Sequence, residues 1–340
     1  MSRSRAWAEL LRLPALFTVP GDALSGAVAA GARPTPRTLL AIGSSLCLYE
    51  AGMALNDWAD RAEDAEERPH RPLPSGRVHP AAAFTAACAL TGAGLALAAR
   101  AGRPALTIAA PLAATVWAYD LALKHTPFGP AAMATARALD LLLGAAATTG
   151  HTRAALPSAA LLGTHTLAVT VVSRQETKGG SPLAPLAALT TTAFLSRVLA
   201  HRPTHSEADR LSGTGPGGAR REAVAHRPPA SLTATAAVAT ARHRRPSPGQ
   251  ARPTTWAWPP ARALTTALAA TYAATAARPY FHATLNPSPP LTQRAVGGGI
   301  RATIPLQAAL SARSGAGLTA LFIAGLAPLG RRFGRKVSIT

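Results

Sequence analysis

The chain has 340 residues, of which 15% are charged, well below the roughly 25% usual for soluble proteins, and its formal net charge is +20. The arginines lie mainly in loops and tails between apolar runs, as in membrane proteins, and do not form a basic face with aromatic platforms. This distribution disfavours a soluble two-domain protein and a nucleic-acid-binding protein. We therefore expect an all-α, polytopic membrane protein.

Nine apolar segments approach the ~20 residues needed to cross a bilayer. They are 14–31, 39–55, 80–99, 104–123, 131–149, 154–172, 183–200, 260–277 and 318–329. A further segment, 296–312, is apolar apart from Arg301 and Gln307 and fits either a tilted span or an interfacial helix. The sequence predicts a bundle of about nine transmembrane helices, multi-pass in the cytoplasmic (inner) cell membrane.

The segments fall into three parts. Residues 1–200 form the predicted helical core, 201–259 are polar and rich in Pro, Gly, Ser and Thr, which predicts a disordered insertion, and 260–340 form the C-terminal helices. Arginines before the first segment favour a cytoplasmic N-terminus, which places the loops after the second, fourth and sixth segments on that side. The basic cluster 331–336 favours the same side for the C-terminus, which requires an even number of spans, so nine or ten stays open.

The most informative segment directly follows the second apolar run. Six of the fifteen acidic residues fall within 57–67. On a helix, Asn56, Asp60 and Asp64 share one face at i, i+4 and i+8, and Asp57 is one residue away from that line. Hard oxygen ligands at this spacing predict a Mg²⁺ site that substrate phosphate would complete. The arginines of residues 68–77 come next and suit the accompanying anion.

Three motifs carry a family resemblance. The pattern Asn56-Asp57-x-x-Asp60-x-x-x-Asp64 resembles the first aspartate-rich motif of the UbiA superfamily of membrane prenyltransferases. Residues 68–77 are similar to that family's Arg-Pro-Leu-x-Ser-Gly-Arg/Lys continuation, and 119–124 resembles its Tyr-x-x-x-x-Lys. The resemblance covers roughly 10–200 and, more loosely, the last two helices.

The resemblance implies Mg²⁺-dependent transfer of a prenyl group from a polyprenyl diphosphate to a small or lipid acceptor, within membrane lipids. It implies that the metal–diphosphate is bound by Asn56, Asp57, Asp60 and Asp64. The phosphates would be held by Arg68, Arg71 and Lys124. Stabilising the departing anion and shielding the allylic cation from water would then supply most of the catalysis.

The second aspartate motif of the family is degenerate in this chain. Where the family has Asp-x-x-Asp-x-x-Gly-Asp, residues 173–180 read Ser-Arg-Gln-Glu-Thr-Lys-Gly-Gly. We expect Arg174 and Lys178 to replace a second metal as direct diphosphate ligands, and Glu176 to bind a second metal or act as a base. The alternative is a lipid- or diphosphate-binding or transport protein on the same scaffold that has lost turnover.

Segments 137–144, 173–180 and 297–301 are also similar to the UbiA-like proteins of bacterial Ebo operons. Ionisable groups inside a membrane are functional candidates by default. Arg137 and Asp140, three residues apart, are therefore either part of the site or a structural ion pair. For His165, inside the sixth apolar segment, hydrogen-bonded packing is the favoured interpretation.

Overall fold

All regular elements of the described residues are helical, which confirms the predicted all-α class. The computed structural model describes residues 3–176, 181–201 and 261–337; Lys178 and nearly all of the predicted insertion lie outside these ranges. The elements are α1 (Arg3–Leu10), η1 (Leu13–Thr18), α2 (Pro20–Ala29), α3 (Pro36–Ala59), α4 (Arg61–Glu67), α5 (Pro80–Ala101), α6 (Arg103–Ala118), η2 (Tyr119–Leu123), α7 (Gly129–Thr149), η3 (Arg153–Ala155), α8 (Leu156–Ser173), α9 (Leu183–Ala200), α11 (Ala261–Leu285), α12 (Pro289–Arg313) and α13 (Gly317–Val337).

Local sequence signals set several helix ends. Proline occupies the first turn of α2, α3, α5, α7 and α12, where its missing N–H has no intrahelical partner to lose. A capping box between Thr35 and Thr38 starts α3. Gly150 ends α7 with φ of 79°, a left-handed conformation that glycine adopts without steric cost. These signals fix the lengths of the apolar helices.

Within the described residues, six helical segments are long and apolar enough to cross a membrane, which indicates a multi-pass membrane protein. They are Pro36–Ala59, Pro80–Ala101, Arg103–Leu123, Gly129–Thr149, Arg153–Ser173 and Leu183–Ala200, and Leu16–Ala29 is a shorter apolar helix. Large apolar side chains such as Leu39, Phe194 and Phe322 are exposed on the outer surface, as expected for a lipid-facing bundle. The exact count of nine spans remains a prediction.

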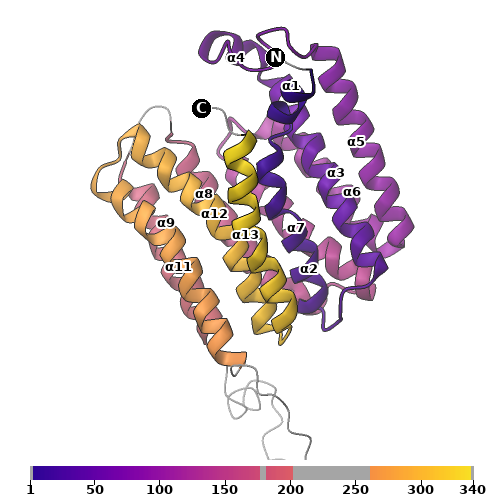
Figure 1. Ribbon diagram of the computed structural model, residues 1–340, viewed down its shortest axis with the longest axis vertical. Coiled ribbons are helices and arrows are strands. Elements are labelled where there is room, and N and C mark those ends of the chain that lie inside the picture. Colours follow the sequence, from indigo (N-terminus) through magenta and orange to yellow (C-terminus); the bar gives the residue numbers. More distant parts are fainter. Residues whose placement is uncertain (1–2, 177–180, 202–260, 338–340) are drawn as a thin grey trace, which may run out of the picture. The chain divides into compact units, whose positions relative to one another are not determined.

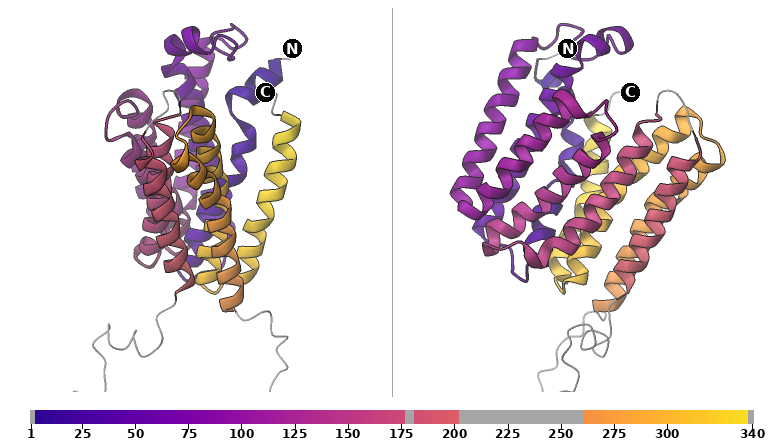
Figure 2. Two further views of the ribbon diagram at one scale, coloured as in Figure 1. Left: turned by 90° about the vertical axis from the view of Figure 1, so that its left-hand side faces the viewer. Right: turned by 180° about the vertical axis from the view of Figure 1, so that it is seen from behind.

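The helices before and after the predicted insertion form one compact unit. Helix α11 packs against α9 and α12, while α12 also packs against α2, α8 and α13 (Figures 1 and 2). The uncertain segment 296–312 is thus part of a 25-residue helix, α12, whose second half is almost entirely buried. It is a packed element of the bundle and not an interfacial helix.

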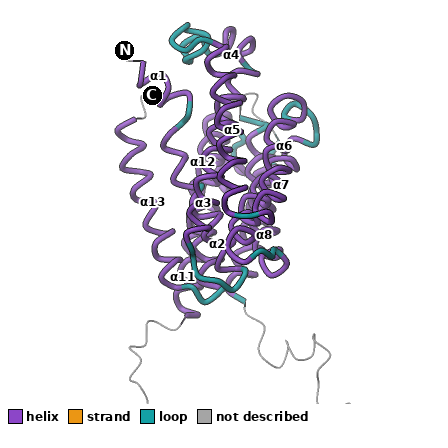
Figure 3. Tube along the Cα trace, turned by 90° about the vertical axis from the view of Figure 1, so that its right-hand side faces the viewer, coloured by secondary structure: helices purple, strands orange, loops and turns teal. Residues whose placement is uncertain are grey.

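One end of the bundle gathers the polar segments. Helices α1 and α4 and the C-terminal end of α13 all lie at that end (Figures 1 and 3). Since α11, α12 and α13 run up, down and up between the two ends, both chain termini reach the same side. The basic residues at 331–336 favour this arrangement, and the side of the membrane stays a prediction.

Candidate active site

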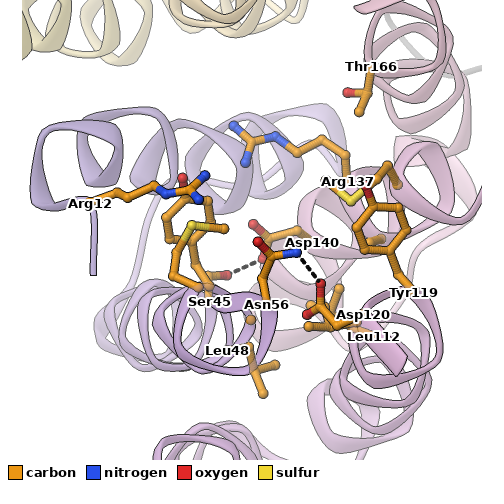
Figure 4. Close-up of a pocket in the computed structure, with 16 residues that line it drawn as sticks. Arg12, Ser45, Leu48, Asn56, Leu112, Tyr119, Asp120, Arg137, Asp140 and Thr166 are labelled. Atoms are coloured by element: carbon orange, nitrogen blue, oxygen red, sulfur yellow. Dashed lines mark hydrogen bonds between the residues drawn. The ribbon is translucent and has the colours of Figure 1, made fainter. Parts of the chain in front are cut away.

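A cavity of about 270 Å³ lies between α3, α6, η2, α7 and α8, with Arg12 beside it. Its walls combine apolar residues such as Leu48 and Leu112 with polar ones. Figure 4 shows Asn56, Asp120 and Asp140 together in the cavity, with the guanidinium groups of Arg12 and Arg137 nearby. An apolar chamber with a charged rim suits a ligand that has a hydrocarbon part and an anionic part.

The acid-rich segment lies at the end of α3, but not on one continuous helix. Helix α3 continues past Leu55 to Ala59, as expected, and α4 begins at Arg61. Asp60, at the junction, has φ of −86° and ψ of 3°, which bends the chain. The single face predicted for Asn56, Asp60 and Asp64 is therefore broken at Asp60, and the side chains diverge to separate partners.

Arg71 links two of the predicted metal ligands. Its Nη1 lies 2.7 Å from Asp64 Oδ2 and 3.7 Å from Asp57 Oδ1. Arg12 Nη2 lies 3.3 Å from the same Asp57 oxygen, and Arg68 Nη1 lies 3.5 Å from Asp64. Asp57 and Asp64 are both buried. The predicted phosphate-binding arginines and the predicted metal-binding carboxylates thus neutralise one another at the rim.

Asp60 is the third acid of the motif, and it pairs with Lys124 across the rim. Residues Tyr119–Leu123 form a single π-helical turn, a feature frequent at functional sites, and Lys124 follows it directly. Lys124 therefore lies beside the acid-rich segment, and its contact with a diphosphate stays a prediction.

Three side chains that could together bind a metal ion lie close to one another, and only one of them belongs to the predicted ligand set. Among the residues that the structure describes, ligand atoms of Asp60, Glu63 and His125 lie within 4.8 Å of one another. The carboxylates of Asp60, which is partly exposed, and of Glu63, which is exposed, fit Mg²⁺, which prefers oxygen ligands and keeps several water or phosphate ligands. Glu63 and His125 were not singled out from the sequence, because exposed acids and histidines are common without a metal.

The degenerate second motif reaches the same rim. Arg174 Nη1 donates a hydrogen bond to the backbone oxygen of Thr126, two residues after Lys124. Glu176 is half-buried; burial raises the pKa of its carboxyl, and the charge of Arg68 opposes this. The structure thus brings Arg174, Glu176 and Arg68 to one end of the bundle, while Lys178 lies outside the described residues.

A buried polar network forms the floor of the cavity. Asn56 Nδ2 donates to Asp120 Oδ1 at 3.2 Å, and Ser45 donates to Asp140. Arg137 pairs with Asp22 of α2, with 3.0 Å between Nε and Oδ2.

The sequence left open whether Arg137 belongs to the site or forms a structural ion pair with Asp140. Arg137 does form an ion pair, but its partner is Asp22. Gln307 of α12 also donates to Asp22 Oδ1, at 2.6 Å. Asp22 was not among the site residues predicted from the sequence. Its position as an acid inside an apolar segment would have indicated it.

His165 has a packing role, as its favoured interpretation predicts. Its two ring nitrogens lie 3.1 Å from the hydroxyl of Tyr272 and 3.0 Å from the backbone oxygen of Gly299. These contacts connect α8 to α11 and α12.

Comparison with known sequences identifies a family. The model of the UbiA prenyltransferase family matches residues 16–200. The chain is 37% identical over 130 residues to a digeranylgeranylglyceryl phosphate synthase of Methanopyrus kandleri, covering 36% of this chain and 45% of the relative. It is 32% identical over 178 residues to the synthase of the same name from Natronomonas pharaonis, covering 52% and 64%. The matches thus span about half the length of these curated relatives.

Solved structures share the fold. A structure of digeranylgeranylglyceryl phosphate synthase in membranes aligns with a TM-score of 0.53 and 14% identity, covering 92% of this chain and 99% of the other. The apo structure of a UbiA homologue from Aeropyrum pernix K1 aligns with a TM-score of 0.56 and 16% identity, covering 87% and 96%. At these identities the likeness establishes the helical architecture.

Proposed function

Because this chain belongs to the UbiA prenyltransferase family, we propose that it transfers a prenyl group from a polyprenyl diphosphate to an acceptor within the cytoplasmic membrane. The observation that carries the proposal is the charge arrangement at the cavity rim. There Arg71 and Lys124 pair with Asp57, Asp60 and Asp64. Arg12, which pairs with Asp57, and Asn56, the neighbour of Asp57 in the chain, both line the apolar chamber. The diphosphate would bind at the rim and the hydrocarbon in the chamber.

The cations of the rim are held by carboxylates until substrate arrives. Arg71 and Lys124 are ion-paired with Asp64 and Asp60, and a diphosphate would offer them stronger, multiply charged acceptors. Arg174 and Lys178 would approach the same anion from the segment that replaces the second aspartate motif. These cations would stabilise the negative charge that accumulates on the diphosphate as it leaves.

Asp60 and Glu63 are the residues that would hold Mg²⁺, with diphosphate oxygens and water as its other ligands. A metal ion there would neutralise part of the leaving group's charge. Once it binds, Lys124 would be free to contact phosphate, since its partner Asp60 would be a metal ligand. Asp57 and Asp64 would keep Arg71 oriented toward the same anion.

Prenyl transfer also needs a proton acceptor. The bond between the prenyl C1 and the diphosphate oxygen breaks, and its electron pair leaves with the diphosphate. An acceptor hydroxyl oxygen then bonds to C1 and releases its proton. Asp120 is placed for that proton: Asn56 holds its Oδ1, while no hydrogen bond from the described residues reaches its Oδ2 in the cavity.

The relatives support a phosphate-bearing acceptor. Their name, digeranylgeranylglyceryl phosphate synthase, combines geranylgeranyl groups with a glyceryl phosphate. In this chain the guanidinium groups of Arg12 and Arg137 line the cavity, and they would suit such a phosphate. The narrower assignment to the Ebo branch stays a prediction from the sequence.

The test is diphosphate release by the purified full chain, incubated with labelled geranylgeranyl diphosphate, Mg²⁺ and a membrane lipid extract. We expect release that disappears in Asp60→Ala. Tight binding of the diphosphate without release, at every acceptor tried, would contradict the proposal and favour the binding or transport protein.

A further inference from the structure

A second cavity, of about 600 Å³, lies between α11, α12 and α13 beside the end of η1. Its volume is within the ~300–1,000 Å³ typical of ligand sites. Most of its lining is apolar, but two arginines, Arg301 and Arg331, form part of its wall. Neither forms an ion pair with a carboxylate in the described part of the chain. An unpaired arginine beside hydrocarbon is costly, and such a residue indicates a ligand or a partner charge.

The surrounding helices offer no acidic partner. Residues 261–337 contain nine basic residues and no acidic residue. The positive-inside rule accounts for the basic residues near the end of α13, but not for Arg301, which lies in the middle of α12, twelve residues from either end. The charge that balances the groove must therefore come from outside this part of the protein.

The two arginines lie at the same level of the bundle. Arg301 precedes the end of α12 by twelve residues, and Arg331 follows the start of α13 by fourteen. At 1.5 Å per residue, both lie about 20 Å from the turn that joins these helices. A Cβ at Gly297, one helical turn further from that turn, would lie only 3.1 Å from Arg301 Nη1. The guanidinium thus points along α12 toward the end that holds both chain termini.

The apolar part of the groove lies in the opposite direction. Ile304 and Ala324 line it one to two helical turns nearer the α12–α13 turn than the arginines do, and Leu268 of α11 completes this part. The groove therefore has a cationic end that faces the end of the bundle with both chain termini, and an apolar end that faces the α12–α13 turn. A bilayer lipid whose headgroup lies toward the chain termini has its anionic and apolar parts in the same order.

We propose that this groove holds an anionic glycerophospholipid of the surrounding bilayer, with its phosphate on Arg301 and Arg331 and one acyl chain along Leu268 and Ile304. Guanidinium groups bind phosphate through paired, charge-assisted hydrogen bonds. Such a lipid would also seal α13, which packs mainly on α12 and η1, against the rest of the bundle.

Native mass spectrometry of the full chain tests the assignment. The purified protein is mixed with equal amounts of phosphatidylglycerol and phosphatidylethanolamine, and the bound lipids are counted. We expect an excess of phosphatidylglycerol that falls in Arg301→Gln/Arg331→Gln by roughly 30-fold, the scale of two basic residues near anionic lipid. An unchanged excess would overturn the proposal.

Two further variants separate charge from folding. Arg100→Gln/Arg103→Gln removes two exposed arginines at the α5–α6 connection and should keep the excess; an equal loss there would overturn the specific site. Arg301→Lys/Arg331→Lys keeps the positive charge and should retain most of the excess of bound phosphatidylglycerol. Loss of that excess in the lysine variant would overturn a charge-based site. Displacement of the bound lipid by inorganic phosphate would overturn the proposal and assign the groove to a soluble anion. Because no readout uses turnover, these results are independent of the proposed enzymatic activity.

Discussion

Lys124, at the end of the π-helical turn η2, donates a hydrogen bond to Asp60, at the junction of α3 and α4. The contact joins two motifs that are 64 residues apart in the chain. Both side chains are mostly shielded from solvent. In the proposed function, the diphosphate would replace Asp60 as the partner of this lysine.

If Lys124 contacts the diphosphate, Lys124→Ala should lower kcat/KM for the prenyl diphosphate by roughly 10- to 150-fold, the range for loss of a hydrogen bond to a charged group. The KM for the acceptor should stay unchanged. Diphosphate-release kinetics measure both values.

Arg61→Ala is the matched control for Lys124→Ala. Arg61 is an exposed cation at the same end of the bundle, where it stacks on Trp58 at 4.5 Å. It should leave kcat/KM unchanged, and a similar loss in both variants would indicate a general charge effect.

The metal assignment predicts a difference between two acids of α4. Glu63→Gln should raise the Mg²⁺ concentration needed for half-maximal activity by at least about tenfold, the scale seen even for outer-shell partners of a metal. Glu66→Gln, three residues later on the same helix, should not. Titration of activity with Mg²⁺ after chelator treatment gives both values, and equal responses would remove Glu63 from the metal site.

Much of the fold and part of the site were accessible from the sequence. Apolar length predicted each helix that carries the cavity, and the resemblance to the UbiA family implied that Asp60 and Lys124 share a site. The sequence could not predict that the chain bends at Asp60, because the bend depends on backbone angles that no residue type there enforces. For the same reason the convergence of Asp60 with Glu63 and His125, and the pairing of Asp22 with Arg137, required the tertiary structure.

A pH-dependent contact fixes the N-terminal helix. Arg77 donates two hydrogen bonds to Glu9, at 2.6 and 3.1 Å, and this pairing lowers the pKa of the Glu9 carboxyl below its ordinary value. A depressed carboxyl pKa stabilises the folded state above the unfolded value and loses that contribution as the pH falls through the folded value. Hydrogen exchange of α1 should therefore quicken below about pH 4.5.

The variant Glu9→Gln tests whether the Glu9 carboxyl causes this pH dependence. Its α1 should exchange faster than that of the wild type at neutral pH and show no further step in the acid range. An acid step that persists in this variant would assign the transition to another carboxyl group.

The buried pair of Asp22 and Arg137 predicts strong non-additivity. Asp22→Ala leaves Arg137 without its carboxylate, and loss of one partner of a buried pair costs about 3–5 kcal/mol. Replacing both by apolar residues of similar size, Asp22→Leu/Arg137→Met, should cost much less, since no unpaired charge remains. Thermal unfolding in detergent compares this double variant with the single variants Asp22→Leu and Arg137→Met. A double variant as unstable as the sum of the single variants would contradict the pairing.

The contact between α2 and α7 depends on two glycines. A Cβ at Gly26 would lie 1.8 Å from the backbone oxygen of Leu141, and one at Gly144 would lie 2.1 Å from that of Ala23. Backbone atoms cannot move aside as a flexible side chain can, so Gly26→Ala should force the helices apart and cost about 1–3 kcal/mol or more. Gly92 of α5 has open space at its Cβ position, so Gly92→Ala should be neutral or stabilising by up to about 1 kcal/mol through helix propensity. Because α7 carries Arg137 and Asp140 into the cavity, Gly26→Ala should lower both diphosphate release and the unfolding temperature. Gly92→Ala should lower neither of these two quantities. Equal effects of the two substitutions would show that α2 and α7 do not meet through Gly26 and Gly144.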